Sequence, residues 1–282
     1  MEIYISTLAL RGYSPEYMIE LAKKNSWALE FSSGMNFSAD MEVLYKNAEI
    51  KRMPHNYFPA PKKPFVLNLA SVNDDIRKQS IEHCWKGLEI AKFSKSPFFA
   101  AHAGFCIDPA PEQLGNKIKI TSHFDREENK KYFIDSVNQI VSKAKKLNID
   151  FLIENNVIAG FNYNNDLNPF LCCNGSEIKW LVEEINQKNF GILLDTAHLK
   201  VSCKTLRLII EEEFQIIRNY IKGVHHSDND GKKDDNSPLT SKYWFLPHLK
   251  FFLNIPHVLE VKDQSEYEIN QQIKYLNTIW NY

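Results

Sequence analysis

Acidic and histidine side chains recur where short apolar segments of the sequence end. Six predicted strands terminate on such a residue. A carboxylate or imidazole at the end of a buried strand is partly desolvated, and an unpaired charge there costs several kcal/mol. Six of them in succession are better explained by a shared ligand than by six separate pairings. In chain order they are His55, His102, Glu154, Asp195, His225 and Glu260.

The last four of these residues lie on four consecutive predicted strands and form the tightest set. We predict that Glu154, Asp195, His225 and Glu260 bind a divalent metal ion, and that Glu154 and Glu260 are also the catalytic carboxylates. Mixed carboxylate and imidazole ligands suit Mn²⁺, Zn²⁺, Co²⁺ or Fe²⁺. Mg²⁺, which favours oxygen ligands, stays a further option, so the sequence leaves the identity of the metal open.

A second group of residues could bind additional metal ions or the substrate. His55 and His102 belong to it, and so does His198, which follows Asp195 in an Asp-Thr-Ala-His segment. Asp234 completes the group, although acidic loops are commonly just solvated. The role of this group, additional metal or substrate, is open at this point.

Other residues near the strand ends are less informative. Neighbours on a strand point to opposite faces, so only one of His225 and His226 can face the interior, and we take it to be His225. Glu30 ends another strand and could contact substrate or form a structural pair. Aromatic candidates for the wall of a pocket are Phe31, Tyr57, Phe58, Phe105 and Trp244.

These residues must be positioned by the alternation of short apolar runs and longer amphipathic ones. Strands are predicted near 3–6, 27–31, 50–55, 97–102, 150–154, 190–195, 221–226 and 257–261. Helices are predicted near 15–25, 39–47, 73–93, 126–147, 177–186, 204–220, 242–252 and 266–280. This alternation favours a parallel sheet, and the count of eight favours closure.

The predicted fold class is therefore α/β, a single (β/α)₈ TIM barrel covering residues 1–282 as one domain. A chain of 282 residues suits one such barrel. A doubly wound open sheet is the alternative. It usually carries a glycine-rich phosphate loop after the first strand, and residues 7–12 do not form one.

Composition excludes several classes of protein. The 34 Lys and Arg residues nearly balance 35 Asp and Glu, so no basic character points to nucleic acid, which is not expected as a partner. The five cysteines include no Cys-x-x-Cys spacing and suggest neither a disulfide framework nor a thiolate zinc site. The start of the chain does not read as a signal peptide, and no apolar run is long enough to span a membrane. A cytoplasmic protein without a membrane partner is expected.

Three stretches of the chain carry a resemblance to a known family. They are Leu152-Ile153-Glu154-Asn155, the segment from Gly191 to His198, and the segment from Gly223 to Gly231. With them, nearly the whole chain resembles the xylose isomerase-like barrel superfamily, which contains sugar isomerases and epimerases and also endonuclease IV-type (AP endonuclease family 2) enzymes. The order Glu, Asp-x-x-His, His, Glu on successive strands is the specific part of the resemblance.

The two branches of this superfamily imply different sites. Resemblance to the ketose epimerases implies one metal held by Glu154, Asp195, His225 and Glu260, with His198 contacting the substrate. Resemblance to the endonucleases implies two or three metals, with His55, His102, His198 and Asp234 added. Asn236 departs from the second pattern, since the endonucleases carry a histidine there, and a neutral amide is a poorer ligand for a transition metal.

The sequence thus leads to a divalent-metal-dependent sugar or sugar phosphate isomerase or epimerase that transfers a proton through an enediolate. Its partner is a small sugar, and a homodimer is an open alternative to a monomer. The other hypothesis is an endonuclease IV-like, metal-dependent phosphodiesterase acting at abasic DNA sites. A barrel that binds a sugar or metal without turnover is a third.

Overall fold

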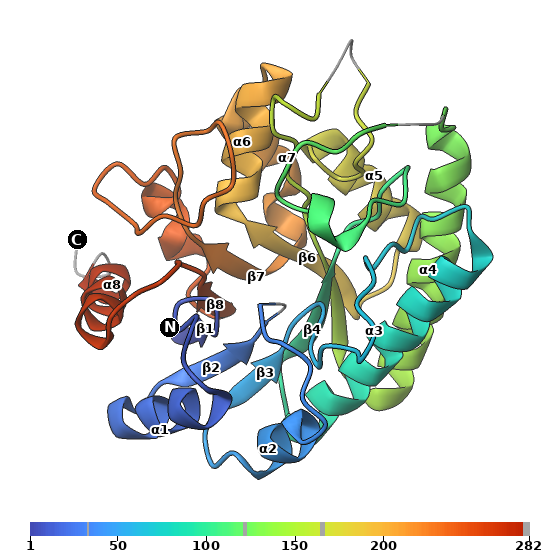
Figure 1. The fold of residues 1–282 in the computed structure, drawn as a ribbon. Coiled ribbons are helices and arrows are strands. Elements are labelled where there is room, and N and C mark those ends of the chain that lie inside the picture. The colour runs from blue at the N-terminus through green and yellow to red at the C-terminus, as the bar shows by residue number, and fades with distance from the viewer. Residues whose placement is uncertain (33, 121–122, 164–166, 279–282) are drawn as a thin grey trace.

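Eight parallel strands form the centre of the molecule. A computed structural model describes residues 1–32, 34–120, 123–163 and 167–278. The strands are β1 (Glu2–Ser6), β2 (Ala28–Phe31), β3 (Arg52–Pro54), β4 (Phe98–His102), β5 (Asp150–Glu154), β6 (Phe190–Asp195), β7 (Ile221–His226) and β8 (Pro256–Leu259). They pair in the order β3-β2-β1-β8-β7-β6-β5-β4, all in parallel (Figure 1). The predicted (β/α)₈ barrel is confirmed.

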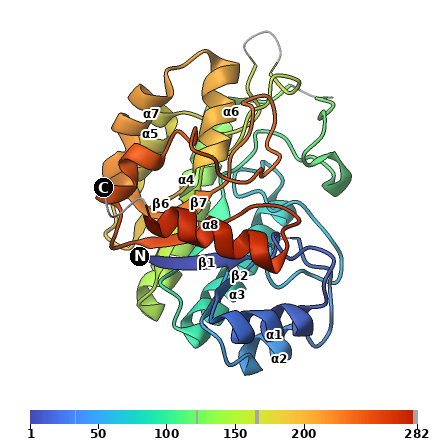
Figure 2. The same cartoon turned by 90° about the vertical axis from the view of Figure 1, so that its left-hand side faces the viewer.

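Helices surround the strands (Figure 2). They are α1 (Pro15–Asn25), α2 (Met41–Asn47), α3 (Asp74–Ser94), α4 (Arg126–Leu147), α5 (Gly175–Ile185), α6 (Thr196–Leu206), α7 (Ile210–Ile217) and α8 (Glu266–Thr278), with short 3₁₀ turns η1 (Pro111–Gln113), η2 (Arg218–Tyr220) and η3 (Leu246–Phe251). Among the described residues, none of these helices is long and apolar enough to cross a membrane.

Local sequence signals account for most helix boundaries. The side chains of Ser14, Asn73 and Asp125 each accept a backbone N–H in the first turn of the helix that follows, which satisfies donors left free at that end. In α4, Phe133, Val137, Ile140, Val141 and Ala144 recur at helical spacing and are all buried against the sheet side. The predicted bounds of α4, β5 and β6 coincide with the observed ones.

Two predicted helices are wrong. A helix over 204–220 was expected, but α6 begins at Thr196, directly after β6, and a break at residues 207–209 separates it from α7. Asp195 caps α6 through its side chain, and Arg207 closes it in a left-handed conformation. In the segment 242–252 the chain forms turns and η3 instead of a continuous helix. The predicted end of the last helix, at Trp280, lies outside the described residues.

The barrel closes between β3 and β4 without a regular ladder. β3 has three residues and ends on Pro54, which has no N–H to donate. Asn56 bridges the gap instead. Its backbone N–H donates to Ala100 O at 2.7 Å, and its side-chain oxygen accepts the N–H of His102 at 3.4 Å. Asn56 adopts a left-handed conformation (φ 44°), which asparagine tolerates better than most residues.

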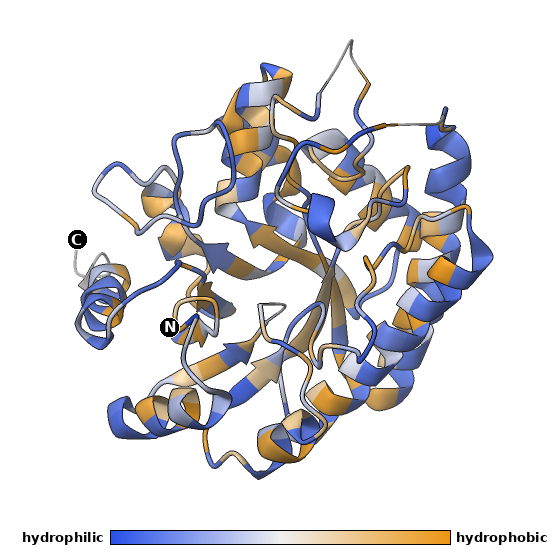
Figure 3. Cartoon of the chain, viewed as in Figure 1, coloured by the Kyte–Doolittle hydropathy of each residue, from blue (hydrophilic) through white to orange (hydrophobic). Residues whose placement is uncertain are grey.

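Side chains alternate strictly between the inside and the outside of the barrel. One buried layer fills the interior and includes Met53, Ala100, Leu152, Leu193 and Val258. The next residue on four of these strands points outward into the apolar layer beneath the helices; these are Ala101, Ile153, Leu194 and Leu259. In Figure 3 the central strands are coloured mostly as hydrophobic, and the helices carry both hydrophobic and hydrophilic residues. The residue after that returns to the interior, one layer closer to the mouth of the barrel.

His226 illustrates the outward direction on β7. Its Nε2 lies 2.7 Å from Nδ1 of His257, whose Nε2 donates to Phe252 O at 2.9 Å. His257 Nδ1 must therefore accept, His226 Nε2 must donate, and His226 Nδ1 accepts from the hydroxyl of Tyr243 at 2.8 Å. Both rings are neutral in this chain. Burial lowers the pKa of His257 to about 4 and the pKa of His226 well below its ordinary value.

This neutral pair makes stability depend on pH. Since the pKa of His257 is lower in the folded state, the unfolded chain binds more protons between about pH 6.5 and 4, and stability falls as the pH falls through that window. We expect His257→Gln to be less stable than the wild type at pH 7. Between pH 6.5 and 5, its free energy of unfolding should also fall by about 2 kcal/mol less than that of the wild type.

Urea unfolding at several pH values checks this expectation. His123→Gln, at an exposed loop histidine, is the matched control and should keep the wild-type pH dependence. An unchanged pH dependence in His257→Gln would contradict a neutral, proton-free Nδ1 in the folded state.

Candidate metal centre and active site

Four strand-end residues converge at the mouth of the barrel. One ligand atom from each of Glu154, Asp195, His225 and Glu260 lies within 4.8 Å of the other three. They lie at the carboxyl ends of β5, β6, β7 and β8, which are neighbours in the sheet. Glu260 comes one residue after β8, but its N–H still donates to His226 O at 3.0 Å, so it continues the strand direction. The side chains of Glu154, Asp195 and His225 are almost completely buried.

His225 lies between three carboxylates. Its Nδ1 is 2.9 Å from Glu260 Oε2 and 3.4 Å from Glu154 Oε1, and its Nε2 is 2.9 Å from Glu30 Oε2. Burial opposes the charged form of the ring, but Glu30, Glu260 and Glu154 outweigh burial and raise the pKa of His225 well above its ordinary value. Both ring nitrogens therefore carry a proton when no metal is bound. A metal at one nitrogen would displace the proton there, while the second nitrogen would keep its hydrogen bond to a carboxylate.

Glu154 is the most shared residue of the site. Its Oε2 lies 3.0 Å from His55 Nε2 and 3.5 Å from His102 Nδ1, and its Oε1 lies 3.7 Å from His198 Nδ1. Burial would raise the pKa of Glu154, but the nearby rings of His102, His225 and His55 lower it well below its ordinary range. Glu154 is therefore ionised at neutral pH.

His198 stands in the first turn of α6 with its two ring nitrogens in different surroundings. Nδ1 donates to Asn155 O at 2.9 Å, because a carbonyl can only accept. That bond leaves Nε2 facing Asp234 Oδ2 at 3.2 Å and Asp195 Oδ2 at 3.8 Å. In the protein as described, Asp195 and Asp234 raise the pKa of His198 against the effect of burial. The same geometry would present a lone pair of Nε2 to a metal ion.

Asn155 holds Asp195 in place. Its side-chain oxygen accepts the N–H of Asp195 at 2.8 Å, and its side-chain nitrogen donates to Asp195 O at 3.0 Å. One carboxylate oxygen of Asp195, Oδ1, accepts the N–H of His198 at 2.7 Å as the cap of α6. The other oxygen, Oδ2, is thereby directed towards the interior of the site.

Several buried polar atoms of the site have no hydrogen-bond partner among the described residues. They are Glu30 Oε1, His55 Nδ1, Asp195 Oδ2 and Asp234 Oδ1. Buried polar groups without partners are rare and call for an explanation such as a bound ion. Carboxylate oxygens and imidazole nitrogens in this arrangement fit a divalent metal. Two further groups, Glu30-His55-His225 and His55-His102-Glu154, also have ligand atoms that lie within 4.8 Å of one another.

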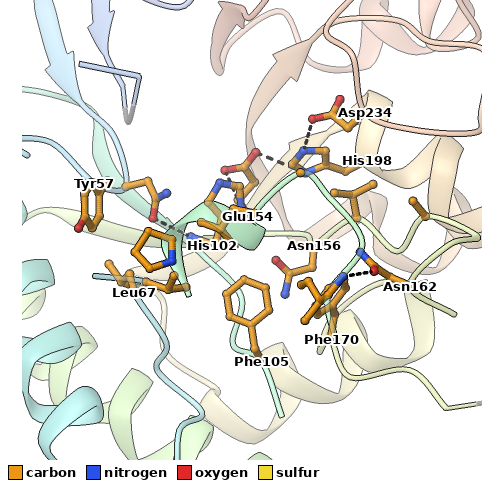
Figure 4. A pocket seen from close by; sticks show the side chains of 18 of the residues that line it. Tyr57, Leu67, His102, Phe105, Glu154, Asn156, Asn162, Phe170, His198 and Asp234 are labelled. Carbon is orange, nitrogen blue, oxygen red and sulfur yellow. Dashed lines mark hydrogen bonds and ion pairs between the residues drawn. The ribbon is translucent and has the colours of Figure 1, made fainter. Parts of the chain in front are cut away.

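The site opens into a pocket of about 460 Å³ (Figure 4). Its polar end contains His102, Glu154, His198, Asp234 and Glu260. Most of the remaining wall comes from the segments after β3, β4 and β5 and is mainly apolar. Among the described residues its aromatic members are Tyr57, Phe65, Phe105, Phe161 and Phe170.

The structure shows which of the residues predicted from sequence lie in the site. It brings His55, His102 and His198 into contact with Glu154, and Asp234 into contact with His198. It also shows His225 facing the interior and His226 facing away from it. Of the aromatic candidates, Tyr57 and Phe105 line the pocket, whereas Phe31 and Phe58 are fully buried in the core and Trp244 packs against Phe214.

Glu30 and Asn155 have larger roles than the sequence suggested. Glu30 was ambiguous, and Asn155 was noted only as part of a matching stretch. The only sequence signal for either was a polar residue at or just after a strand end, where the barrel interior lies.

The comparison with known families agrees with this geometry. Residues 37–267 match the family described as xylose isomerase-like TIM barrel. The chain belongs to this family.

Two curated proteins that are similar to this chain over most of its length share one name. A protein of Mesomycoplasma hyopneumoniae named "Probable endonuclease 4" is 28% identical over 212 residues, covering 70% of this chain and 67% of its own length. A Persephonella marina protein of the same name is 25% identical over 224 residues, with 73% and 70% covered.

Solved structures share the fold over almost the full length. A D-tagatose 3-epimerase-like protein superposes with a TM-score of 0.74 at 20% identity, covering 100% of this chain and 97% of its own. An AP endonuclease of family 2 from Brucella melitensis superposes with a TM-score of 0.66 at 14% identity, covering 97% and 98%. These likenesses establish the fold.

The contact between Glu30 and His225 leads to a prediction about metal binding. A carboxylate that holds the second nitrogen of a metal-binding imidazole fixes the orientation and basicity of the ring. We expect Glu30→Gln to bind Mn²⁺ or Zn²⁺ about 10- to 100-fold more weakly than the wild type. We expect Asp195→Asn, which alters a member of the four-residue set, to lose more metal affinity than Glu30→Gln.

Competition with a metal-binding dye measures both affinities, and circular dichroism shows whether the variants fold. Glu82→Gln, at an exposed position on α3, is the control. Wild-type affinity in Glu30→Gln would show that His225 does not depend on this carboxylate for metal binding.

Proposed function

We propose that this protein is a divalent-metal-dependent isomerase or epimerase of a sugar or a closely related polyhydroxy carbonyl compound. The observation that carries the proposal is the combination of the four-residue set with a pocket of small-molecule size. Glu154 and Glu260 belong to both the set and the pocket wall. A volume of about 460 Å³ lies within the range of pockets that enclose small ligands.

The two glutamates supply the proton-transfer groups. A metal at the four-residue set would polarise the carbonyl and adjacent hydroxyl of a bound sugar, and so acidify the C–H between them. One of Glu154 and Glu260 accepts this proton, and the electron pair of the broken C–H bond moves to the carbonyl oxygen to give an enediolate. In epimerisation the other glutamate, once protonated from solvent, delivers its proton to the opposite face of the same carbon, and the first glutamate releases its proton to solvent. In isomerisation the first glutamate returns its proton to the neighbouring carbon, while the hydroxyl proton on that carbon moves to the former carbonyl oxygen.

The charges of the site support this assignment. Nearby histidines lower the pKa of Glu154, and His225 lowers the pKa of Glu260, in each case against burial. Both carboxylates are therefore ionised near neutral pH, as a proton acceptor must be. The ion pairs of both carboxylates are with imidazole rings, so two ionised carboxylates can coexist close together.

Incubation with a panel of ketoses in deuterated water tests the proposal. The Mn²⁺-loaded protein should introduce solvent deuterium at the carbon next to the carbonyl, as seen by NMR or mass spectrometry. Glu154→Gln and Glu260→Gln should each reduce this exchange about 10²- to 10⁴-fold, because each variant removes one proton-transfer group.

The control for this experiment is again Glu82→Gln, which should exchange deuterium like the wild type. The absence of exchange with every sugar in the panel, by protein that carries its metal, would count against the proposal.

A metal-dependent phosphodiesterase acting at abasic DNA sites is the second candidate. His55 and His102 beside Glu154, and His198 beside Asp234, offer more ligands than one metal needs. The similarity to proteins named "Probable endonuclease 4" points the same way. Asn236 points against it, since this buried residue lines the pocket next to Asp234 with an amide in place of a stronger ligand.

Two measurements separate the candidates. One equivalent of tightly bound metal favours the isomerase, and two or three favour the hydrolase. Cleavage of an oligonucleotide with a single abasic site, lost in Glu154→Gln, would establish the hydrolase, and intact DNA together with deuterium exchange would exclude it.

A further inference from the structure

We infer that the substrate is uncharged and carries an apolar group, aryl or alkyl, on the end remote from its carbonyl. This inference rests on the proposed function, because it places the carbonyl at the four-residue set. The remote end of the substrate would then occupy the rest of the pocket. We call the part of the pocket beyond His102 and Glu154 the apolar arm; its lining includes Tyr57, Phe65, Leu67, Phe105, Ile118 and Phe170.

The apolar arm is lined mainly by aromatic and aliphatic side chains. Its inner wall is well packed. The ring centroids of Phe105 and Phe170 lie 5.2 Å apart in an edge-to-face arrangement, and those of Tyr57 and Phe65 lie 5.5 Å apart with tilted rings. At its outer end, Leu114 and Phe161 line the same pocket with 45% and 42% of their surface exposed. Large apolar side chains left open around one cavity indicate an apolar ligand that covers them.

The polar side chains in the wall of the arm are already engaged within the protein. Asn162 accepts the N–H of Ile118 at 2.8 Å and donates to Asn116 O at 3.0 Å. The side-chain nitrogen of Asn156 donates to the carbonyls of Ala103, Gly104 and Leu171. The hydroxyl of Tyr57 accepts the N–H of Phe65 at 2.5 Å. These groups offer few hydrogen bonds to the hydroxyls of a longer sugar.

Charge argues against a phosphorylated substrate. Among the described residues that line the pocket, Lys233 is the one lysine or arginine, and it is exposed and adjacent to Asp234 at the polar end. A phosphate in the apolar arm would lie among Phe105, Ile118 and Phe170 without a cation. Burying such a charge unpaired costs several kcal/mol, whereas a phenyl or alkyl group there gains free energy from the area it buries.

Three probes that differ only at the remote end test the inference. They are one ketose active in the deuterium exchange, its benzyl ether and its phosphate ester, the last two substituted at the end away from the carbonyl. The Mn²⁺-loaded protein should exchange deuterium into the benzyl ether with a kcat/KM at least about tenfold above that of the parent ketose. The phosphate ester should fall below the parent. A phosphate ester equal to or better than the benzyl ether would overturn the inference.

A binding measurement without turnover keeps this test independent of the proposed function. Acetohydroxamate and a phenylbutanoyl hydroxamate share one metal-chelating head, so the difference in their affinity for the Mn²⁺-loaded protein reports the tail alone. Calorimetry should show the phenyl-bearing compound binding at least about tenfold more tightly. Equal affinities would overturn the apolar arm as a ligand site.

Variants at the exposed outer end locate the effect with little risk to folding. Leu114→Ser and Phe161→Ala should each reduce the gain from the phenyl tail about threefold to tenfold and leave acetohydroxamate binding unchanged. Leu208→Ser, at a leucine of similar exposure (38%) outside the pocket, is the matched control. A tail gain that survives both pocket variants would contradict the inference.

The two proposals fail in different ways. Exchange with no ketose, alongside a retained phenyl-tail gain, would reject the proposed reaction and support an apolar ligand in the arm. Exchange without any preference for the benzyl ether would reject the inference and leave the proposed reaction in place.

Discussion

The period of two along a β-strand is the constraint on which the site depends. Residues two apart point the same way, so the layer that fills the barrel determines what lies above it. Met53, Ala100, Leu152, Leu193 and Val258 occupy the interior. His55, His102, Glu154, Asp195 and Glu260, two residues further along, must then face the mouth. On β7 the interior position is Gly223, where a Cβ would come within 2.8 Å of Phe98, and His225 follows it by the same rule. A shift of one residue in any strand would turn its ligand outward.

This rule brings carboxylates and imidazoles together in a place that water barely reaches. The protein balances them by alternation of charge: His225 lies between Glu30, Glu154 and Glu260, and Glu154 lies among several histidines. The balance is incomplete, because four buried polar atoms of the site have no hydrogen-bond partner among the described residues. A divalent cation would satisfy such atoms, and its binding would release the protons that the histidines hold in its absence.

Much of this arrangement could be predicted from sequence, and for a physical reason. Strands buried on both faces are continuous apolar runs, so a polar residue that ends such a run is easy to recognise, as with Glu154 and Asp195. The alternation of side chains along a strand also implies that only one of His225 and His226 faces the interior. The same alternation assigns Glu30 to the interior, but nothing in the sequence shows that Glu30 contacts His225, 195 residues away.

The parts that could not be predicted depend on contacts between distant loops. The start of α6 at Thr196 follows from the helix cap that Asp195 provides. Asp195 was expected to bind metal, so its second role as a helix cap was not predicted. The apolar arm is built from segments after β3, β4 and β5 whose aromatic residues show no periodic pattern. Tyr57 and Phe105 could be named as candidates, but Phe31 and Phe58 could not be distinguished from them without knowing which face of the barrel each one meets.

Anomalous diffraction from crystals soaked in Mn²⁺ or Zn²⁺ tests the central claim of this account most directly. The account predicts a principal anomalous peak among the side chains of Glu154, Asp195, His225 and Glu260. A strong peak elsewhere on the protein with none among these four residues, or no ordered metal at all under saturating conditions, would contradict it.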